Sequence, residues 1–537
     1  MIRRPRRQMG ICPKEAAMAR QSKFSPASKS PRPTTARSAP SGRAAGQSGR
    51  EVISMPEAIA ILKTTQPTFY RWLRTGRLKG MKVGRQWRFY RDDIERVLKG
   101  ESPIVELPGD IGPLISTLGE RLKKAGVKPP DREGETGVEK AVRYMIALGP
   151  VLNASDVHIT SHLDPATSKP VTVARYRIDG VLHQVAEIDP RLLPAIIEQW
   201  KRLSGCDVHD KERPQDGRMI VSPSLLGIKG DGNVDTRVSF IPTGLGESLT
   251  ARFLLAVTAA FDLRRIDYAT SDRERILRAL RLPWGLILIT GPTGCGKTTV
   301  LYSCINELAR PEIKILTIED PVEYYLPWAT QIAVREQAGV TIERAMRAAL
   351  RSDPDVIMVG EIRNAEILNI VNAAALTGHM VLSTLHTDDA AGALRRMVEM
   401  GSDAFVVADA TKLVVAQRLI RKLCPHCSVE GTPAATQLDL AAEAARKGGL
   451  NWRTLEPRWR KPVGCDKCSM TGYKGRNVIA EVLEMTPEIG RALRSNASLD
   501  ELRAIAVSQG MTTMAADGIR RAASGETTLD EAMRVMG

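Results

Sequence analysis

The stretch Gly291-Pro-Thr-Gly-Cys-Gly-Lys-Thr298 decides the fold class of this chain. It matches the phosphate-binding pattern GxxxxGK[ST] at every fixed position. The apolar run 286–289 before it predicts a buried strand, and a helix is expected over Thr299–Leu308. In this strand–loop–helix context the pattern predicts a P-loop, whose backbone N–H groups and helix N-terminus surround phosphates.

The residues of this loop have expected roles in binding ATP. Lys297 is expected to neutralise the β- and γ-phosphates, and the Thr298 hydroxyl to bind Mg²⁺. A chance glycine-rich turn is the alternative, which the complete context disfavours. The predicted nucleotide-binding residues are Gly291, Pro292, Thr293, Gly294, Cys295, Gly296, Lys297, Thr298 and Thr299.

Further apolar runs follow the loop at 313–318, 356–359 and 380–384, with helical segments between them. Runs that alternate with helices predict a mostly parallel sheet covered on both faces, and therefore an α/β fold. Ligand-binding groups in such sheets lie where the strands end.

Carboxylates and histidines flank the ends of these predicted strands. Three carboxylates lie within Glu319–Glu323, and Glu361 follows the 356–359 run. Glu361 occupies the Walker B position, but Gly360 stands where many nucleotide hydrolases have the Mg²⁺-linked Asp. The carboxylate linked to Mg²⁺ is therefore expected to be Glu361 or a member of the 319–323 cluster. His379 and His386 flank the 380–384 run.

These sequence boxes, in this order, resemble the secretion ATPases that drive type II secretion and type IV pilus assembly. The resemblance covers about residues 135–537 and continues in Arg175–Gly180, Arg237–Glu247 and 510–528. Two departures are Asn364, where that family usually has Asp, and Asp388, where it usually has Asn. The resemblance implies a RecA-like ATPase domain over 266–420, an α+β domain of the N2 type over 136–265, and a homo-hexamer.

The resemblance also implies catalytic roles. The glutamates would orient and deprotonate the attacking water, and the arginines would reach phosphate from a neighbouring domain or subunit, where one arginine can be worth about 10³–10⁵ in rate. Ordinary surface ion pairs are the alternative for the arginines. The histidines would sense the γ-phosphate or be satisfied core groups. The implied catalytic residues are Glu361, Glu323, Arg237, Arg252, His379 and His386.

Two CxxC pairs predict a metal site in an insertion over residues 421–475. Cys424 and Cys427 form the first pair, and Cys465 and Cys468 form the second. Two such pairs can hold Zn²⁺ tetrahedrally through four thiolates. Two unconnected pairs, or a redox pair, are the alternatives. In the resembled family the assembly and secretion members have such a site and the retraction members lack it, which favours assembly or secretion.

Residues 51–100 resemble the winged helix-turn-helix of excisionase and MerR-like proteins. Arg71 and Arg74 are three residues apart on one predicted helix, from which they could reach a DNA major groove. Lys82 and Arg85 lie in the predicted wing and are the expected phosphate contacts. A protein-docking version of the same small fold stays open.

The net charge of +16 comes from the N-terminal hundred residues. Residues 1–50 hold 12 Lys or Arg and one Glu, and residues 51–100 hold 11 basic against five acidic residues. The other 437 residues hold 54 basic and 55 acidic residues. Residues 1–50 contain almost no large apolar residues, so they are expected to be a disordered basic leader. Met9, Met18 and Met55 are possible later starts.

The remaining segments complete the expected organisation. Residues 101–135 are expected to be a linker with one short amphipathic helix, and residues 476–537 a helical C-terminal region. No run of 18 apolar residues predicts a membrane-spanning helix, and the start lacks the apolar stretch of a secretory signal. A cytoplasmic protein peripheral to the inner membrane is therefore expected.

Together with these sequence features, the family resemblance implies a hexameric motor that hydrolyses ATP with Mg²⁺ and carries Zn²⁺. We expect it to power assembly of type IV pili or type II secretion pseudopili through an inner-membrane platform protein. The alternative is a DNA-binding ATPase that acts in DNA uptake, transfer or regulation through residues 51–100.

Overall fold

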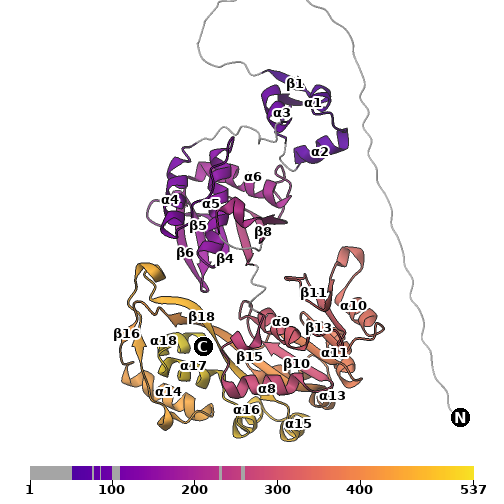
Figure 1. The fold of residues 1–537 in the computed structure, drawn as a ribbon, viewed down its shortest axis with the longest axis vertical. Helices are drawn as coiled ribbons and strands as arrows, with labels where there is room; N and C mark the ends of the chain where they lie inside the picture. The colour runs from indigo at the N-terminus through magenta and orange to yellow at the C-terminus, as the bar shows by residue number, and fades with distance from the viewer. Residues whose placement is uncertain are drawn as a thin grey trace, which may run out of the picture. The chain divides into compact units, whose positions relative to one another are not determined.

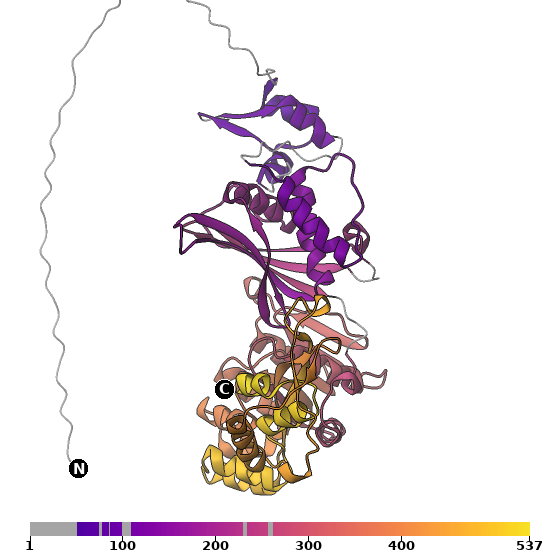
Figure 2. The same ribbon diagram turned by 90° about the vertical axis from the view of Figure 1, so that its left-hand side faces the viewer.

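The computed structural model describes residues 51–74, 78–84, 86–98, 109–228, 233–255 and 261–536. The expected leader, residues 1–50, lies outside them. The described residues form four sheets, which Figure 1 shows with their helices and Figure 2 shows after a turn of 90°.

The first described residues form three helices and a three-stranded sheet of order β1-β3-β2. Helix α1 begins at Met55 because the backbone N–H and the hydroxyl of Ser54 both donate to the Glu57 carboxylate at 2.7 Å, which caps the helix. The rings of Phe69 and Phe89 meet edge to face in the core, with centroids 5.1 Å apart. The elements of this helix-turn-helix module are β1 (Val52–Ser54), α1 (Met55–Ile61), α2 (Gln66–Arg74), β2 (Met81–Val83), β3 (Gln86–Tyr90) and α3 (Arg91–Leu98).

An α+β domain follows, built on a six-stranded antiparallel sheet of order β6-β5-β4-β9-β8-β7. The hairpin between β5 and β6 turns at Asp179-Gly180, where both residues have positive φ, as a two-residue turn of this kind requires. Helices pack on one face of the sheet, and alternate residues of β8 are buried beneath them. The elements are α5 (Gly137–Val151), β4 (Ala154–Leu163), β5 (Pro170–Ile178), β6 (Val181–Ile188), α6 (Leu193–Ser204), β7 (Gln215–Val221), α7 (Pro223–Leu226), β8 (Val234–Thr243) and β9 (Gly246–Leu255).

The stretch expected to be a linker contains the amphipathic helix α4 (Gly112–Lys124). Its side chains Leu114, Leu118 and Leu122 recur every four residues and are buried in the same core as α5. Helix α4 therefore packs as part of the α+β domain.

The ATPase domain is built on a seven-stranded sheet of order β12-β11-β13-β14-β10-β15-β18. All neighbouring strands are parallel except β15 and β18, and alternate residues of β10 enter two different cores, one on each face of the sheet. The predicted α/β fold is thereby confirmed. Its elements are α8 (Thr270–Leu280), β10 (Gly285–Thr290), α9 (Lys297–Leu308), β11 (Ile315–Glu319), β12 (Ala329–Ala333), α10 (Ile342–Ala349), β13 (Val356–Val359), α11 (Ala365–Leu376), β14 (Met380–Leu385), α12 (Ala390–Glu399), α13 (Ala404–Ala410) and β15 (Thr411–Leu423).

The C-terminal part differs from the expected helical region in its first residues. Residues 476–484 belong to the edge strand β18, which pairs antiparallel with β15 along nearly its whole length. Its residues 477–483 are all buried, because the strand has a core on each side. The remaining elements are β16 (Val429–Glu430), α14 (Ala435–Lys447), β17 (Arg460–Lys461), β18 (Tyr473–Glu484), α15 (Pro487–Arg494), α16 (Leu499–Ser508), α17 (Met514–Ala523) and α18 (Leu529–Met536).

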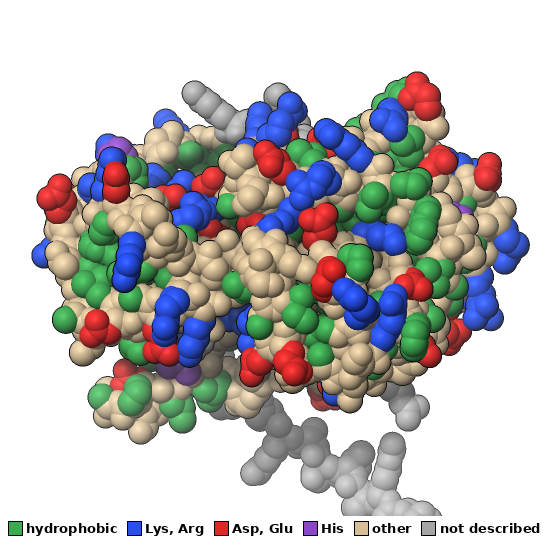
Figure 3. Space-filling model, turned by 90° about the horizontal axis from the view of Figure 1, so that it is seen from below, with side chains coloured by type: hydrophobic (Ala, Val, Ile, Leu, Met, Phe, Trp, Pro, Cys, Tyr) green, Lys and Arg blue, Asp and Glu red, His purple; other side chains and the backbone are tan. Residues whose placement is uncertain are grey.

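The surface shows how charge is distributed outside the N-terminal hundred residues. On the face shown in Figure 3, basic and acidic side chains are intermixed, in keeping with 54 basic and 55 acidic residues over residues 101–537. Among the described helices, none has the length and apolar character needed to cross a membrane.

Candidate functional site

The P-loop follows β10, and α9 begins inside it. Gly291, Gly294 and Gly296 have φ of 141°, 79° and 90°, which side chains with a β-carbon rarely adopt. A β-carbon on Gly291 would also lie 2.4 Å from the carbonyl oxygen of Gln417. The path of the loop therefore requires these glycines, and it brings the N-terminus of α9 to the end of the sheet, where a helix favours phosphate.

Lys297 and Thr298 begin α9 beside the loop. The Lys297 ammonium donates to the carbonyl oxygens of Gly291 and Pro292 at 2.8 and 3.0 Å. Burial lowers the pKa of Lys297, and the negative charge of Glu361 opposes this shift. Thr298 is half-buried and Thr299 exposed in the same turn. This set of groups fits the phosphates of ATP, with the Thr298 hydroxyl as the protein ligand that Mg²⁺ would use.

Glu361 follows β13, two strands from β10 and at the same edge of the sheet as the P-loop. One oxygen of its carboxylate lies 3.4 Å from His386 Nε2, and the other accepts from Arg363 Nε. Burial disfavours the charge of Glu361, but Arg363 and His386 outweigh it and hold its pKa below the usual value. Glu361 is therefore ionised at neutral pH and can accept a proton from water.

Arg363 lies two residues after Glu361 and has no role predicted from the sequence. Its Nη2 donates to Asp320 at 3.0 Å while its Nε contacts Glu361, so it joins the carboxylates that follow β11 and β13. The sequence signal that points to Arg363 is an arginine two residues after a carboxylate at the end of a predicted strand. Of the two departures from the resembled family, Asn364 caps α11, accepting from the Ile367 N–H at 2.9 Å.

Carboxylates at the end of β11 and just after it have different environments. Glu319 is buried, and its oxygens accept from Thr317, Gln331 and Tyr302, so its role is structural. Burial raises the pKa of Glu323, and Arg237 and Arg252 oppose this rise. Glu323 thus holds a proton more readily than Glu361.

Arg237 and Arg252 are cross-strand partners on β8 and β9 of the α+β domain. Arg252 Nε donates to Asp156 at 3.0 Å. The Arg237 side chain has no hydrogen bond or ion pair with the residues that the structure describes, and both arginines act electrostatically on Glu323. The structure therefore brings the predicted arginines toward the carboxylate cluster of the ATPase domain.

The two predicted histidines lie at opposite ends of β14. His386 follows β14 and contacts Glu361, whereas His379 precedes β14. Its Nδ1 lies 3.0 Å from the Ala374 carbonyl oxygen, and its own carbonyl oxygen accepts from Gly285 N–H at the start of β10. A six-residue strand spans about 20 Å, so His379 lies at the opposite edge from the P-loop. Within one chain, the position of His379 therefore gives no support to its expected γ-phosphate role.

The four predicted zinc ligands come together. The Sγ atoms of Cys424, Cys427, Cys465 and Cys468 all lie within 4.8 Å of one another. The distances for 424–465, 427–468 and 465–468 are 3.9, 3.8 and 3.7 Å. Thiolates 2.3 Å from a tetrahedral Zn²⁺ are about 3.8 Å apart, so the cluster fits this ion.

Backbone donors support thiolates in this cluster. The N–H groups of Cys465 and Gly472 donate to Cys468 Sγ, each at 3.2 Å, and that of Gly464 donates to Cys427 Sγ at 3.4 Å. Burial opposes charge on Cys468, but its backbone donors lower the pKa of this thiol. The four cysteines would hold Zn²⁺ and so join the two ends of the insertion.

The predicted DNA contacts are described only in part. Arg71 lies on α2 and Lys82 on β2, and both side chains are exposed. The side chain of Arg74 and the whole of Arg85 lie outside the described residues.

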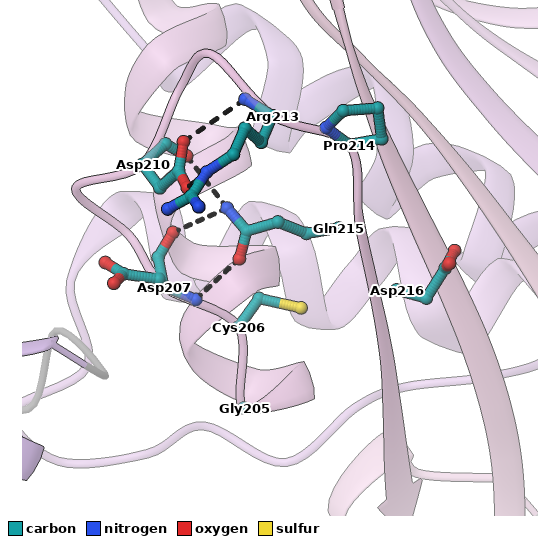
Figure 4. Close-up of a pocket in the computed structure, with 8 residues that line it drawn as sticks. All are labelled: Gly205, Cys206, Asp207, Asp210, Arg213, Pro214, Gln215 and Asp216. Carbon is teal, nitrogen blue, oxygen red and sulfur yellow. Dashed lines mark hydrogen bonds and ion pairs between the residues drawn. The ribbon is translucent and has the colours of Figure 1, made fainter. Parts of the chain in front are cut away.

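A hollow of about 460 Å³ in the α+β domain lies between α6 and β7, away from the P-loop motif (Figure 4). The Gln215 amide donates to the carbonyl oxygens of Asp207 and Asp210 at 2.9 and 2.8 Å and accepts from Asp207 N–H at 2.8 Å. Arg213 donates to the Asp210 carboxylate at 2.7 Å. Because these wall groups bond to one another, we assign the hollow no ligand.

Comparison with known proteins gives the family. Residues 131–534 match the model of the Type II/IV secretion system protein family, and residues 52–102 match that of a helix-turn-helix domain. A type IV pilus assembly ATPase, PilB of Thermus thermophilus, is 37% identical over 79% of this chain and 46% of its own length. The type II secretion system protein HxcR of Pseudomonas aeruginosa is 40% identical over 71% of this chain and 74% of its own length.

A solved structure supports the fold. The ATPase DotB of Legionella pneumophila superposes with a TM-score of 0.53 at 21% identity, over 76% of this chain and 97% of that protein. The family match covers the P-loop, the Glu361 strand and the cysteine cluster alike. The chain is a P-loop ATPase that belongs to the Type II/IV secretion system protein family.

Proposed function

We propose that this chain couples ATP hydrolysis to movement between its α+β and ATPase domains. The P-loop would bind the phosphates, with Lys297 neutralising their charge and Thr298 holding Mg²⁺. Glu361, ionised and fixed by Arg363 and His386, would orient the attacking water and accept its proton. The bound Mg²⁺ would supply charge neutralisation between the phosphates.

This proposal is supported by the electrostatic effect that two arginines of the α+β domain have on Glu323 of the ATPase domain. A guanidinium that reaches the transferring phosphoryl group stabilises charge that is largest in the transition state. Arg237 would reach the phosphoryl group only when the two domains are closed, so hydrolysis would require closure. Once hydrolysis is complete this contact is lost, which favours opening of the domains. Arg252 is restrained by Asp156, so Arg237 is the better candidate.

Replacing Arg237 tests this coupling. Arg237→Ala should lower kcat by about 10³-fold or more, while MgADP binding stays within about threefold of the unchanged protein. Arg218→Ala is the matched control, because Arg218 faces Arg237 across β7 and β8 but its guanidinium is bound by Asp235. Equal, small losses in both variants would contradict the role of Arg237.

At the level of the assembly, we propose a homo-hexamer that powers type IV pilus assembly or type II secretion. It would act at the cytoplasmic face of the inner membrane on a platform protein. The names of the two relatives support this class of cargo, and the cysteine cluster favours assembly or secretion over retraction. Light scattering with and without MgATP should give the mass of six chains. A strain with Lys297→Ala should lack the surface fibre if the system assembles pili, or the secreted protein if it is a secretion system.

A second proposal concerns residues 51–98, where a helix-turn-helix match coincides with the basic side chains Arg71 and Lys82. We propose that this module reads DNA and connects the motor to DNA uptake, transfer or regulation. Selection from random duplexes with the full chain should yield one enriched motif. Arg71→Ala should weaken binding to that motif by about 10-fold or more and spare other duplexes. Equal weakening on every duplex would indicate a protein-docking or purely electrostatic module.

A further inference from the structure

The ATPase domain begins with a short segment, residues 266–268, that reaches the P-loop through one buried amide. The Tyr268 hydroxyl donates to Gln417 Oε1, and Gln417 Nε2 donates to the Cys295 carbonyl oxygen at 2.8 Å. Tyr268 and Gln417 are 4% and 1% exposed, so water cannot replace either bond. Two hydrogen bonds therefore connect the start of the domain to the middle of the phosphate-binding loop.

Gln417 is suited to this place by its side chain and its backbone. Because the Cys295 carbonyl only accepts, the amide nitrogen must face it, and the amide oxygen then accepts from Tyr268. The Gln417 carbonyl oxygen lies so close to Gly291 that a β-carbon there would be 2.4 Å away. A β-carbon on Gly296 would be 3.4 Å from Gln417 Nε2. Gln417 thus contacts the loop near its beginning, middle and end.

The other end of this connection is anchored by residues of strand β18 and helix α17. Asp267 accepts from Asn477 Nδ2 at 2.7 Å and from Arg521 Nη1 at 3.1 Å, and Arg521 also donates to the Asp267 carbonyl. Arg521 is 1% exposed on α17, where its charge is balanced by Asp517 and Glu526. These contacts fix Asp267 in place. Because Asp267 directly precedes Tyr268, they also restrain the orientation of the Tyr268 ring.

We infer that Tyr268 and Gln417 are positioning residues for the nucleotide, acting through the Cys295 carbonyl on the shape of the P-loop. The inference rests on the nucleotide site described above and extends it to the segment where the chain enters the ATPase domain. A peptide whose carbonyl is held in one direction has its N–H held as well. Loss of this restraint lets the loop N–H groups turn away from the phosphates. ADP and ATP depend on the same loop, so binding of both weakens by a similar factor.

Tyr268→Phe tests this with little change of core volume. The Kd for MgADP, measured by titration calorimetry on the full chain, and the KM for ATP should both rise about tenfold, the equivalent of one buried hydrogen bond. The kcat should change less than about threefold, because ground state and transition state use the loop alike. Tyr176→Phe is the matched control: its buried hydroxyl donates to the Met145 carbonyl at 2.7 Å in the α+β core. That variant should lose thermal stability but keep the Kd.

A double-mutant cycle tests whether Tyr268 acts through Gln417. Gln417→Glu keeps an acceptor for Tyr268 and loses the donor to Cys295, so it should weaken MgADP binding at least as much as Tyr268→Phe. The double variant should bind like Gln417→Glu alone, because the two side chains act in series. Independent, additive losses, or an unchanged Kd in Tyr268→Phe with Tm lowered as in the control, would overturn the inference. MgADP binding by the unchanged chain, and weaker binding by Lys297→Ala, test the nucleotide site separately.

Discussion

Asp272 predicts how the stability of the ATPase domain depends on pH. It lies in the first turn of α8, is 2% exposed, and accepts from Arg275 Nη1 at 3.2 Å. Burial and the nearby Asp517 raise its pKa from 3.8 to about 6, against the opposing charges of Arg275 and Arg520. The folded chain therefore retains a proton on Asp272 at a pH where the unfolded chain has lost it.

The sign and size of the effect follow from this difference. Below about pH 4 Asp272 is protonated in both states and has no effect on the free energy of unfolding. As pH rises from about 4 to about 6, Asp272 ionises in the unfolded chain before it ionises in the folded chain, so the free energy of unfolding falls. Above about pH 6 the decrease reaches its full value of about 3 kcal/mol. Asp272→Asn should thus stabilise the domain at pH 8 by up to about 3 kcal/mol and by little at pH 4.5.

Thermal unfolding of the full chain, followed between pH 4.5 and pH 8, measures this dependence. The Asp272→Asn variant should unfold at a higher temperature than the unchanged chain at pH 8, and the gap should close as pH falls through 6. Asp500→Asn is the control, because Asp500 has a 92% exposed side chain and a surface pair with Arg503. A gap that does not vary with pH, or a variant less stable at pH 8, would refute the raised pKa of Asp272.

Three further outcomes are expected from the sites already described. Lys297→Ala should weaken MgATP binding by about 10- to 100-fold and abolish turnover without lowering Tm, measured by calorimetry and phosphate release, because it removes one charged contact from a loop shaped by backbone; a variant that still turns over ATP contradicts this. One zinc per chain should copurify by metal analysis and be lost in Cys424→Ser with Cys427→Ser, after which residues 421–475 become protease-sensitive and MgADP still binds; reductant-protected protein without zinc sinks the assignment. Lys82→Ala should weaken all duplexes alike and reduce the slope of log K against log salt by about one, and an unchanged slope removes Lys82 from the DNA-facing surface.

The nucleotide site could be predicted from sequence because its chemistry is local. The glycines, Lys297 and Thr298 lie within eight residues, and the loop needs positive φ at fixed positions. The position of Glu361 could be predicted for a similar reason, since a carboxylate at the end of an apolar run in a parallel sheet lies at the ligand-binding edge. The zinc cluster needed only the spacing of two CxxC pairs.

The parts of the fold that the sequence did not predict depend on tertiary contacts. Residues 476–484 contain the helix formers Ala480, Glu481 and Leu483, but burial on both sides and pairing with β15 make them a strand. Helix α4 shows an apolar stripe, but only the core it enters shows that the stripe packs with the α+β domain.

His379 and Gln417 show the two limits of sequence reasoning at the site itself. His379 precedes its strand, so parallel topology puts it at the far edge, and that signal was available. Tyr268 and Gln417 are 149 residues apart and belong to no motif, so only the fold brings them together under the P-loop.

The role of Glu361 is the most direct test of the hydrolytic mechanism. Single-turnover hydrolysis of MgATP by Glu361→Gln should slow by about 10²- to 10⁴-fold, because the amide cannot accept the proton of water, while MgATP binding is retained. Glu366→Gln, an exposed glutamate paired with Arg347 at 3.3 Å, should hydrolyse ATP at the unchanged rate. Near-normal turnover by Glu361→Gln would contradict the account and transfer water activation to Glu323.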